Sequence, residues 1–440
     1  MAIFAYGKRF DMKGARQGLR ALSPLLVFLT VYLVTSVVSA DFYKIPVSSA
    51  FLVACMFSLV VSGGSIKDKV GTFLSGAGNR NVLLMVWIFI LAGAFSGTAK
   101  DIGAIEATVD FTMRIIPPKM ILAGLFLTSC FISMALGTSV GTIVALVPIA
   151  GGIAGQTGTN PAYMAAIIVG GALFGDNLSF ISDTTIASTK ALGCEMKDKF
   201  KANIYIVAPA VVVVTAIYLF QGNGIVSPGL PSGMHEWFKL IPCLLIIALA
   251  LAGRDVTLVL VAGILANAVI GFFTHSFSWT GWLASLGNGI AGMTDLIVIT
   301  LLAGGLLEMI RANGGIDFII RVLTSKVRGK RGAQFSIAAL VSLADLCTAN
   351  NTIAIITTGS IARDISDRAG LDPRKTASIL DTFSCMVQGV IPYGAQVMMA
   401  AGLVGCSPTS ILPHLYYPYM MGIVAVLAIL FKYPAKYSNQ

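Results

Sequence analysis

Charged residues are scarce in this sequence. They make up 11% of the 440 residues, whereas hydrophobic residues make up 56%. A soluble domain has about 25% charged residues. Since so few charges cannot cover a water-facing surface of this size, helices that face lipid must form most of it. The composition therefore predicts an all-α polytopic membrane protein. It excludes a nucleic-acid-binding domain, despite a net charge of +10.

Metal-binding and nucleotide-binding patterns are also missing. The seven cysteines form no C-x-x-C pair, the three histidines lie far from them in the sequence, and no G-x-x-x-x-G-K pattern occurs. These absences exclude a disulfide framework, a zinc site and ATP hydrolysis by this chain. Residues 137–141 match G-x-S-x-G, but a nucleophile elbow requires a preceding strand and a His partner. We therefore expect neither an enzyme nor a resident cofactor. If the protein moves a solute, an ion gradient or the solute's own gradient must drive it.

Long uncharged runs predict about ten membrane crossings. Lys and Arg cluster in residues 1–20, in the loops around residues 67–80, 190–201 and 321–331, and near the end of the chain, whereas residues 221–237 contain neither. Positive charge favours the cytoplasmic side. We therefore expect a bacterial-type inner membrane protein with a cytoplasmic segment 1–20, an external linker 221–238 and a cytoplasmic tail 433–440.

The sequence resembles itself at an offset of about 211 residues. Ala92–Ala94 aligns with Ala303–Gly305, and Gly103–Glu106 aligns with Gly314–Asp317. The order of apolar and amphipathic segments also recurs. This pattern predicts a first repeat over residues 21–220 and a second over residues 239–432.

Each repeat contains an apolar segment of unusual length. Met120–Gly155 would be about 54 Å long as one helix, and it contains Gly, Ser and Thr at its middle. A re-entrant hairpin with its tip in the membrane fits better than one helix or two complete crossings. We predict hairpins at 118–155 and 333–365 and broken helices at 161–190 and 376–403. Five crossings per repeat would invert the second repeat relative to the first; two ordinary helices per segment would instead give parallel halves.

Four acidic residues lie in apolar stretches beside predicted helix breaks: Asp176, Asp183, Asp345 and Asp381. A charge at the bilayer centre costs about 2.5–3.5 kcal/mol on insertion scales. Since no apolar segment supplies a Lys or Arg to pair with them, we expect a cation or a proton as their partner. Asp381 lies near the start of its span and could equally be a pairing or access-path residue.

The predicted break at 173–185 offers hard oxygen ligands that suit Na⁺. Asp176 and Asp183 are the candidate Na⁺ ligands, and Ser182 begins a new helix as its N-cap. The second repeat carries Gln388 where the first has Asp176, so the predicted site is asymmetric. The candidate ion-binding or substrate-binding residues are Thr138, Ser139, Thr142, Asp176, Asn177, Ser179, Ser182, Asp183, Thr184, Thr185, Asp345, Asn350, Asn351, Thr352 and Gln388.

The motifs at 137–142, 174–179 and 182–185 together resemble the NhaC family of Na⁺/H⁺ antiporters, within the ion-transporter superfamily. Family members usually carry Pro where this chain has Phe180. The resemblance implies a rigid scaffold, a moving transport domain that carries both hairpins, and a homodimer. Relatives exchange malate for lactate or carry amino acids with Na⁺.

Two functions follow as hypotheses. In the first, Na⁺ and H⁺ compete for the buried aspartates of an antiporter. In the second, Na⁺ is coupled to uptake or exchange of an amino acid or small organic acid. The helix ends at Thr138–Thr142 and Asn350–Thr352 would then take the substrate carboxylate. A channel fits less well, because paired hairpins and inverted halves suit alternating access.

Overall fold

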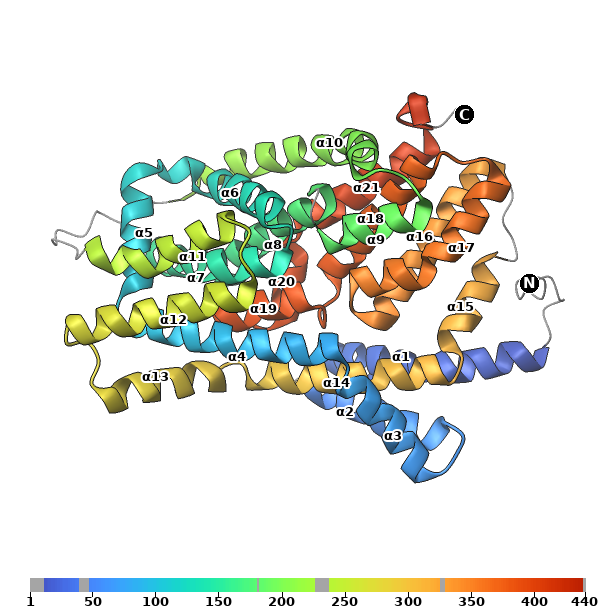
Figure 1. Cartoon of the computed structure of the whole chain (residues 1–440), viewed down its shortest axis with the longest axis horizontal. Coiled ribbons are helices and arrows are strands. Elements are labelled where there is room, and N and C mark those ends of the chain that lie inside the picture. Colours follow the sequence, from blue (N-terminus) through green and yellow to red (C-terminus); the bar gives the residue numbers. More distant parts are fainter. Residues whose placement is uncertain (1–11, 39–46, 180–181, 226–236, 325–328, 438–440) are drawn as a thin grey trace.

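The computed structural model describes residues 12–38, 47–179, 182–225, 237–324 and 329–437, and all regular structure within them is helical. The predicted segments 1–20, 221–238 and 433–440 lie partly outside the described residues, and Phe180 lies outside them entirely. Most helices run along the long axis of the molecule, as Figure 1 shows.

The first half of the chain forms ten α-helices. They are α1 (Met12–Val38), α2 (Val47–Val61), α3 (Ile66–Ala77), α4 (Arg80–Asp101), α5 (Ala104–Ile115), α6 (Ile121–Leu136), α7 (Ser139–Thr157), α8 (Pro161–Leu178), α9 (Asp183–Leu192) and α10 (Met196–Gly222).

The second half forms the remaining α-helices. They are α11 (Ile241–Leu251), α12 (Val256–Phe273), α13 (Trp279–Ala291), α14 (Thr294–Ala312), α15 (Gly315–Thr324), α16 (Gly329–Thr348), α17 (Asn351–Ala369), α18 (Pro373–Val390), α19 (Ala395–Val404), α20 (Pro408–Ile411) and α21 (Tyr416–Leu430).

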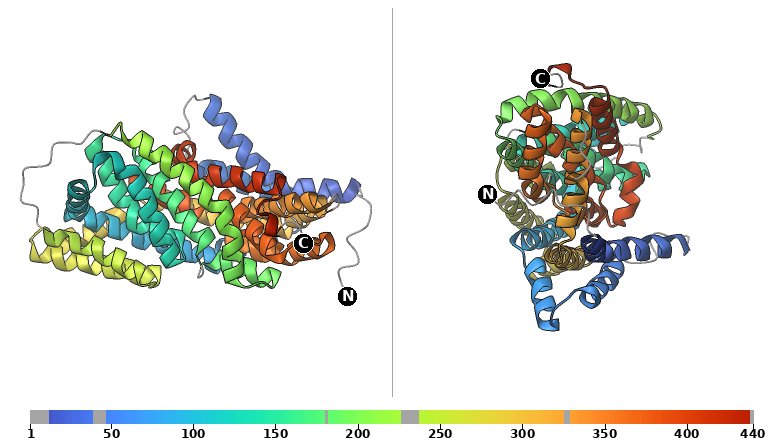
Figure 2. Two further views of the ribbon diagram at one scale, coloured as in Figure 1. Left: turned by 90° about the horizontal axis from the view of Figure 1, so that it is seen from above. Right: turned by 90° about the vertical axis from the view of Figure 1, so that its right-hand side faces the viewer.

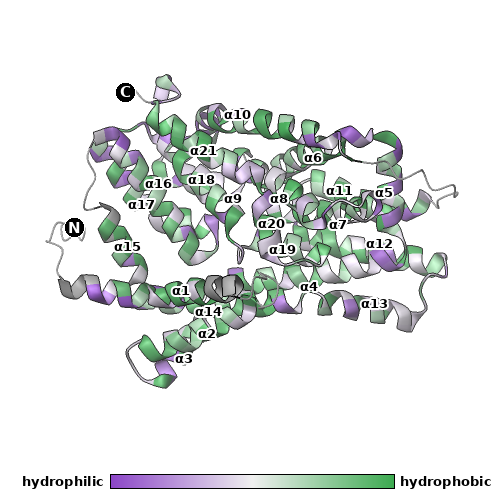
Figure 3. Cartoon of the chain, turned by 180° about the vertical axis from the view of Figure 1, so that it is seen from behind, coloured by the Kyte–Doolittle hydropathy of each residue, from purple (hydrophilic) through white to green (hydrophobic). Residues whose placement is uncertain are grey.

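Several of these helices are suited to cross a bilayer. Among the described residues, 7 are long and apolar enough, or up to 9 if each bent pair of helices counts as one span. Seen from behind in Figure 3, hydrophobic residues dominate the helices, and hydrophilic stretches gather near α5 at one end of the long axis and near α16 and α17 at the other. The expected all-helical membrane protein is confirmed, while the number of ten crossings stays a prediction.

The helices form two layers, which the end-on view of Figure 2 separates. One layer consists of α1–α4 and α12–α14, in which α14 packs on α2 and α3, and α4 packs on α12 and α13. The α4–α13 contact is very close, because a Cβ on Gly93 would lie 2.4 Å from the carbonyl oxygen of Gly289. The other layer consists of α6–α10 and α16–α21. The predicted site residues lie in this second layer, which we call the site layer.

The two halves share local backbone conformations. The break between α6 and α7 places Gly137 at φ 68° and then Thr138 in an extended conformation; the break between α16 and α17 repeats this at Ala349 (φ 47°) and Asn350. Three further pairs of left-handed glycines recur at nearly the same offset as in the sequence: Gly103 with Gly314, Gly158 with Gly370, and Gly193 with Gly405. Left-handed backbone ends helices and is disfavoured for residues with a Cβ, so these positions terminate corresponding helices in both halves.

Helices of the two halves also pack against each other in the site layer. α7 of the first half packs against α19 of the second, and α17 of the second half packs against α9 of the first. The two helix breaks therefore meet partners from the opposite half of the chain.

Candidate functional site

The site begins at the carboxyl end of α8, which α6 holds in place. Ser133 Oγ donates to the carbonyl oxygen of Ala172 at 2.5 Å, and Ser179 Oγ donates to that of Met134 at 2.8 Å. A Cβ on Gly175 would lie 2.2 Å from Ser133 Cβ. This close packing of small residues fixes the last turn of α8, where Asp176 lies.

Asp176 caps the start of α7. Its Oδ1 accepts from the Ser139 main-chain N–H at 3.1 Å, and its Oδ2 accepts from Ser139 Oγ at 2.6 Å. The Asp176 side chain is buried. A carboxylate is favoured at a helix N-terminus, because free N–H groups and the helix dipole both attract negative charge. Asp176 and Ser139 were both predicted from the sequence, and the structure brings them into direct contact.

The break after α8 uses the predicted hydroxyl residues. The main-chain oxygen of Asp176 accepts from Ser182 Oγ at 2.6 Å and from Thr184 Oγ1 at 3.0 Å. Ser182 also caps α9 by accepting from the Thr185 N–H at 3.3 Å. Asp183, by contrast, is exposed on the first turn of α9. The two acidic residues named as Na⁺ ligands therefore differ in burial.

Lys199 is a buried cation that the sequence analysis assigned to a cytoplasmic loop. It lies in the first turn of α10, is 1% exposed and forms an ion pair with Asp381, which is 0% exposed. Its Nζ also donates to the Asn177 carbonyl oxygen at 2.5 Å and to Thr185 Oγ1 at 2.9 Å. The expectation that no Lys or Arg pairs with the buried aspartates is therefore wrong for Asp381. A buried ion pair is stable only when its charged groups also make further hydrogen bonds. Lys199 Nζ meets this condition, because it has three oxygen partners.

Asn203 extends the same contact one turn further along α10. Its Nδ2 donates to the Asn177 carbonyl oxygen at 2.9 Å, and its Oδ1 accepts from Ser378 Oγ at 2.7 Å and Thr382 Oγ1 at 2.9 Å. The Asn203 side chain therefore connects the end of α8 to α18 by hydrogen bonds. Lys199 and Asn203 were not among the predicted site residues, because their partners Asp381 and Ser378 lie far away in the sequence.

The second half supplies amides rather than carboxylates. Gln388 Nε2 donates to the Ala349 carbonyl oxygen at 3.2 Å and to Gln396 Oε1 at 2.8 Å, and Gln396 Nε2 donates to Ser139 Oγ at 2.9 Å. A continuous chain of hydrogen bonds thus joins the break after α16, through Gln388 and Gln396, to Asp176. Gln396 was not among the predicted site residues.

The remaining predicted residues lie around this chain. Asn350 caps α17 by accepting from the Ile353 N–H at 3.0 Å, and Asn351 Nδ2 donates to Cys385 Sγ at 3.8 Å. Thr142 Oγ1 donates to the Thr138 carbonyl oxygen at 3.2 Å. Thr352 is half-buried in the first turn of α17. Asp345 is fully buried in α16.

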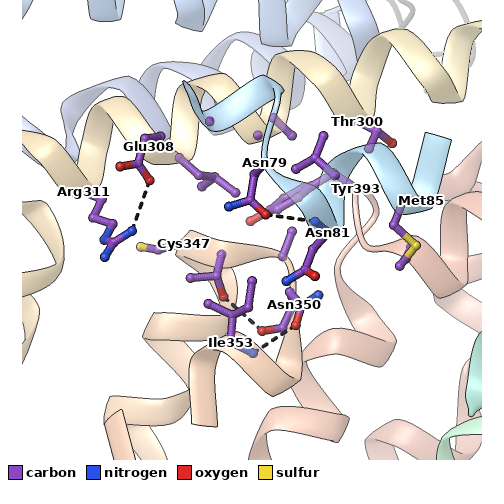
Figure 4. A pocket seen from close by; sticks show the side chains of 18 of the residues that line it. Asn79, Asn81, Met85, Thr300, Glu308, Arg311, Cys347, Asn350, Ile353 and Tyr393 are labelled. Carbon is purple, nitrogen blue, oxygen red and sulfur yellow. Dashed lines mark hydrogen bonds and ion pairs between the residues drawn. The ribbon is translucent and has the colours of Figure 1, made fainter. Parts of the chain in front are cut away.

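A cavity of about 270 Å³ lies between the two layers, next to the break after α16. Its polar lining includes Asn79, Asn81, Thr300 and Asn350, as Figure 4 shows. Glu308 and Arg311 form an ion pair of 3.4 Å at the same cavity, with both side chains partly exposed. The described residues contain no group of three or more His, Cys, Asp or Glu side chains that could hold a metal ion.

Comparison with known proteins identifies the family. The sequence profile of the Na⁺/H⁺ antiporter family matches residues 19–222 and 240–435. The chain belongs to the Na⁺/H⁺ antiporter family. This match confirms the resemblance inferred from the motifs at 137–142 and 174–185, and it extends over both halves of the chain.

Individual relatives in and around the Na⁺/H⁺ antiporter family differ in what their names say they exchange. The malate-2H⁺/Na⁺-lactate antiporter of Bacillus subtilis (strain 168) is 25% identical, with 97% of this chain and 97% of that protein covered. The Na⁺/H⁺ antiporter NhaC of the same organism is 22% identical, with 80% and 84% covered. The arginine/ornithine antiporter ArcD of Halobacterium salinarum is 22% identical, with 80% and 79% covered. The family consists of membrane antiporters rather than enzymes.

Proposed function

We propose that this protein is a sodium-coupled secondary active transporter that exchanges Na⁺ for H⁺ across a bacterial-type inner membrane. The observation that carries the proposal is Asp176, a buried carboxyl group where the start of α7 meets the broken end of α8. Its carboxylate and the neighbouring Ser139 hydroxyl group offer oxygen ligands of the kind that Na⁺ requires.

Competition between the two ions explains coupling at such a site. A desolvated carboxylate must be neutralised, and either Na⁺ or H⁺ can do this. When Na⁺ binds Asp176, the proton leaves; when a proton binds, Na⁺ leaves. Only the neutralised carrier then crosses between inward-open and outward-open states. Asp183 contributes as an exposed negative charge beside the break, where it attracts cations to the site.

The proposed architecture is a pair of inverted repeats. The shared left-handed positions of the two halves, and the reciprocal packing of α7 on α19 and of α17 on α9, support it. In this arrangement α6/α7 and α16/α17 are the re-entrant hairpins, the layer of α1–α4 and α12–α14 is a scaffold in a homodimer, and the site layer moves.

A second candidate function is Na⁺-coupled exchange of a small organic acid or amino acid. The observation that favours it is the 270 Å³ cavity beside Asn350, which is larger than a bare Na⁺ needs. The relatives named for malate/lactate and for arginine/ornithine exchange agree with this alternative.

Proteoliposomes distinguish the two functions. Under the first, an imposed Na⁺ gradient changes the internal pH, reported by a trapped dye, with no organic solute present. Under the second, ²²Na⁺ uptake requires malate, lactate or an amino acid. Asp176→Asn abolishes transport under either, whereas Asp364→Asn, which alters an exposed ion pair on α17, leaves it unchanged. Transport by Asp176→Asn at the normal rate would remove Asp176 from the mechanism.

A further inference from the structure

Asp345 is the least satisfied acidic residue in the part of the chain that the structure describes. It is 0% exposed, and within the described residues neither of its carboxyl oxygens has a hydrogen-bond partner. The other two buried aspartates that lie within helices of the site layer differ from it. Asp176 accepts two hydrogen bonds from Ser139, and Asp381 pairs with Lys199.

No charged group among the described residues compensates the Asp345 carboxyl group. Helices α14, α15, α17, α18 and α21 pack around α16. The described titratable groups that interact with the carboxyl group are Cys347 and Tyr393, both neutral, and its polar neighbour is the main-chain amide of Gln388. An isolated carboxylate in such surroundings carries a large desolvation penalty, which a bound proton removes.

We infer that Asp345 is a second proton-binding site, separate from Asp176, and that the proton it carries is transported. This inference rests on the proposed Na⁺/H⁺ exchange and deepens it, because it assigns a proton to a group that does not bind Na⁺ in competition. The carboxylate takes up H⁺ from solvent to become the neutral acid, and it returns the same H⁺ to solvent on the other side.

The cavity supplies the route to solvent. Cys347, Thr348 and Ala349, which follow Asp345 in the chain, line the cavity, and so does Tyr393. Tyr393 Oη donates to the Leu346 carbonyl oxygen at 2.7 Å. Since Tyr393 lines the cavity and is bonded to the residue after Asp345, a displacement of this ring would, in the proposed cycle, open a path from the cavity to the carboxyl group.

A chain of hydrogen bonds runs from Gln388, a neighbour of Asp345, to the proposed Na⁺ ligand. The main-chain amide of Gln388 lies near the Asp345 carboxyl group, and the Gln388 side chain reaches Asp176 through Gln396 and Ser139. Gln388 Oε1 is itself buried without a partner among the described residues. Ionisation of Asp345 would reorient the Gln388 side chain and thereby change the donors available to Asp176, which couples proton release to Na⁺ binding.

Infrared spectroscopy of the purified full-length protein tests protonation directly. The protein at neutral pH gives a carbonyl stretch from protonated carboxyl groups, and Asp345→Asn removes one component of this band. Asp367→Asn, a matched control with 67% exposure on the neighbouring helix α17, leaves the band unchanged. An unchanged band in Asp345→Asn overturns the inference, whatever the protein transports.

Transport assays test the role of the proton. In proteoliposomes, Asp345→Asn moves fewer protons per Na⁺ than the wild type but retains ²²Na⁺/Na⁺ exchange, because the Asp176 site remains intact. Asp176→Asn loses both the Na⁺-driven proton flux and the Na⁺ exchange. Proton flux at the wild-type level in Asp345→Asn overturns the inference and leaves the proposed function standing. Wild-type protein without any Na⁺-driven proton flux removes the proposed exchange, while the infrared result still decides whether Asp345 binds a proton.

Discussion

The buried ion pair between Lys199 and Asp381 should contribute strongly to the free energy of unfolding. Lys199→Met removes the ammonium group and leaves a carboxylate that is 0% exposed without its cation. Removing one member of a buried pair costs about 3–5 kcal/mol, because the other charge stays desolvated. The Asn177 carbonyl oxygen and Thr185 Oγ1 also lose a donor, so we expect a loss in the upper part of this range.

Asp381→Asn is the milder change. The amide oxygen of Asn still accepts from Lys199, and Lys199 keeps its bonds to Asn177 and Thr185. Loss of a charge-assisted hydrogen bond costs about 1.5–3 kcal/mol. The double variant Lys199→Met/Asp381→Asn leaves no buried charge behind, so it should be more stable than Lys199→Met alone.

A double-mutant cycle measures this coupling. The free energy of unfolding is determined in detergent by titration with a denaturing surfactant, monitored by circular dichroism. Lys197→Met, at an exposed position on the same helix, controls for the loss of a lysine and should change stability by less than about 0.5 kcal/mol. If the changes in unfolding free energy of the two single variants were strictly additive in the double variant, the argument that each buried charge compensates the other would be refuted.

Three smaller changes test the geometry around the site. Ser139→Ala removes the hydroxyl donor to Asp176 and the acceptor for Gln396; it should lower the unfolding free energy by at least about 1 kcal/mol and weaken apparent Na⁺ affinity in the proteoliposome assay. A Cβ on residue 175 would lie 2.2 Å from Ser133 Cβ, so Gly175→Val should prevent folding, and little folded protein should be recovered by size-exclusion chromatography. Gly155→Ala has open space at the Cβ position and should fold normally. Ala349→Gly relieves a left-handed backbone at φ 47° and should raise stability by up to about 1 kcal/mol in thermal unfolding, while Ala349→Val should lower it. A destabilising Ala349→Gly would show that the break is not strained.

Local signals explain why the helix breaks could be predicted from the sequence. Gly137 and the N-cap Ser182 each mark a helix end through the conformation or hydrogen bond of one residue. The same reasoning could not separate Asp176 from Asp183, since both flank one break. Their difference in burial comes from α6 and α7 packing over one and leaving the other exposed.

Long-range contacts explain what the sequence analysis missed. Lys199 follows other lysines after a polar loop, so charge counting placed it with the cytoplasmic cluster. Its partner Asp381 lies 182 residues away, and only the packing of α10 on α18 brings the two together. Gln396 likewise acts through Ser139, 257 residues before it. Neither contact leaves a periodic or local pattern in the chain.

The three buried aspartates that lie within helices of the site layer have different partners, and in the proposed cycle this difference determines which of them can drive transport. The partner of Asp381 is Lys199, which is covalently part of the chain and cannot leave. Asp176 is held by donors at the start of α7, and movement of that helix end would release it for Na⁺. Asp345 has no side-chain hydrogen bond within the described residues, and in the proposed cycle it binds a proton. In the proposed cycle, the fixed pair therefore adds no net charge to the moving layer. The charge that crosses the membrane then depends on which ions occupy Asp176 and Asp345. The net charge moved per transport cycle therefore reports whether one or both of these sites exchange their ion.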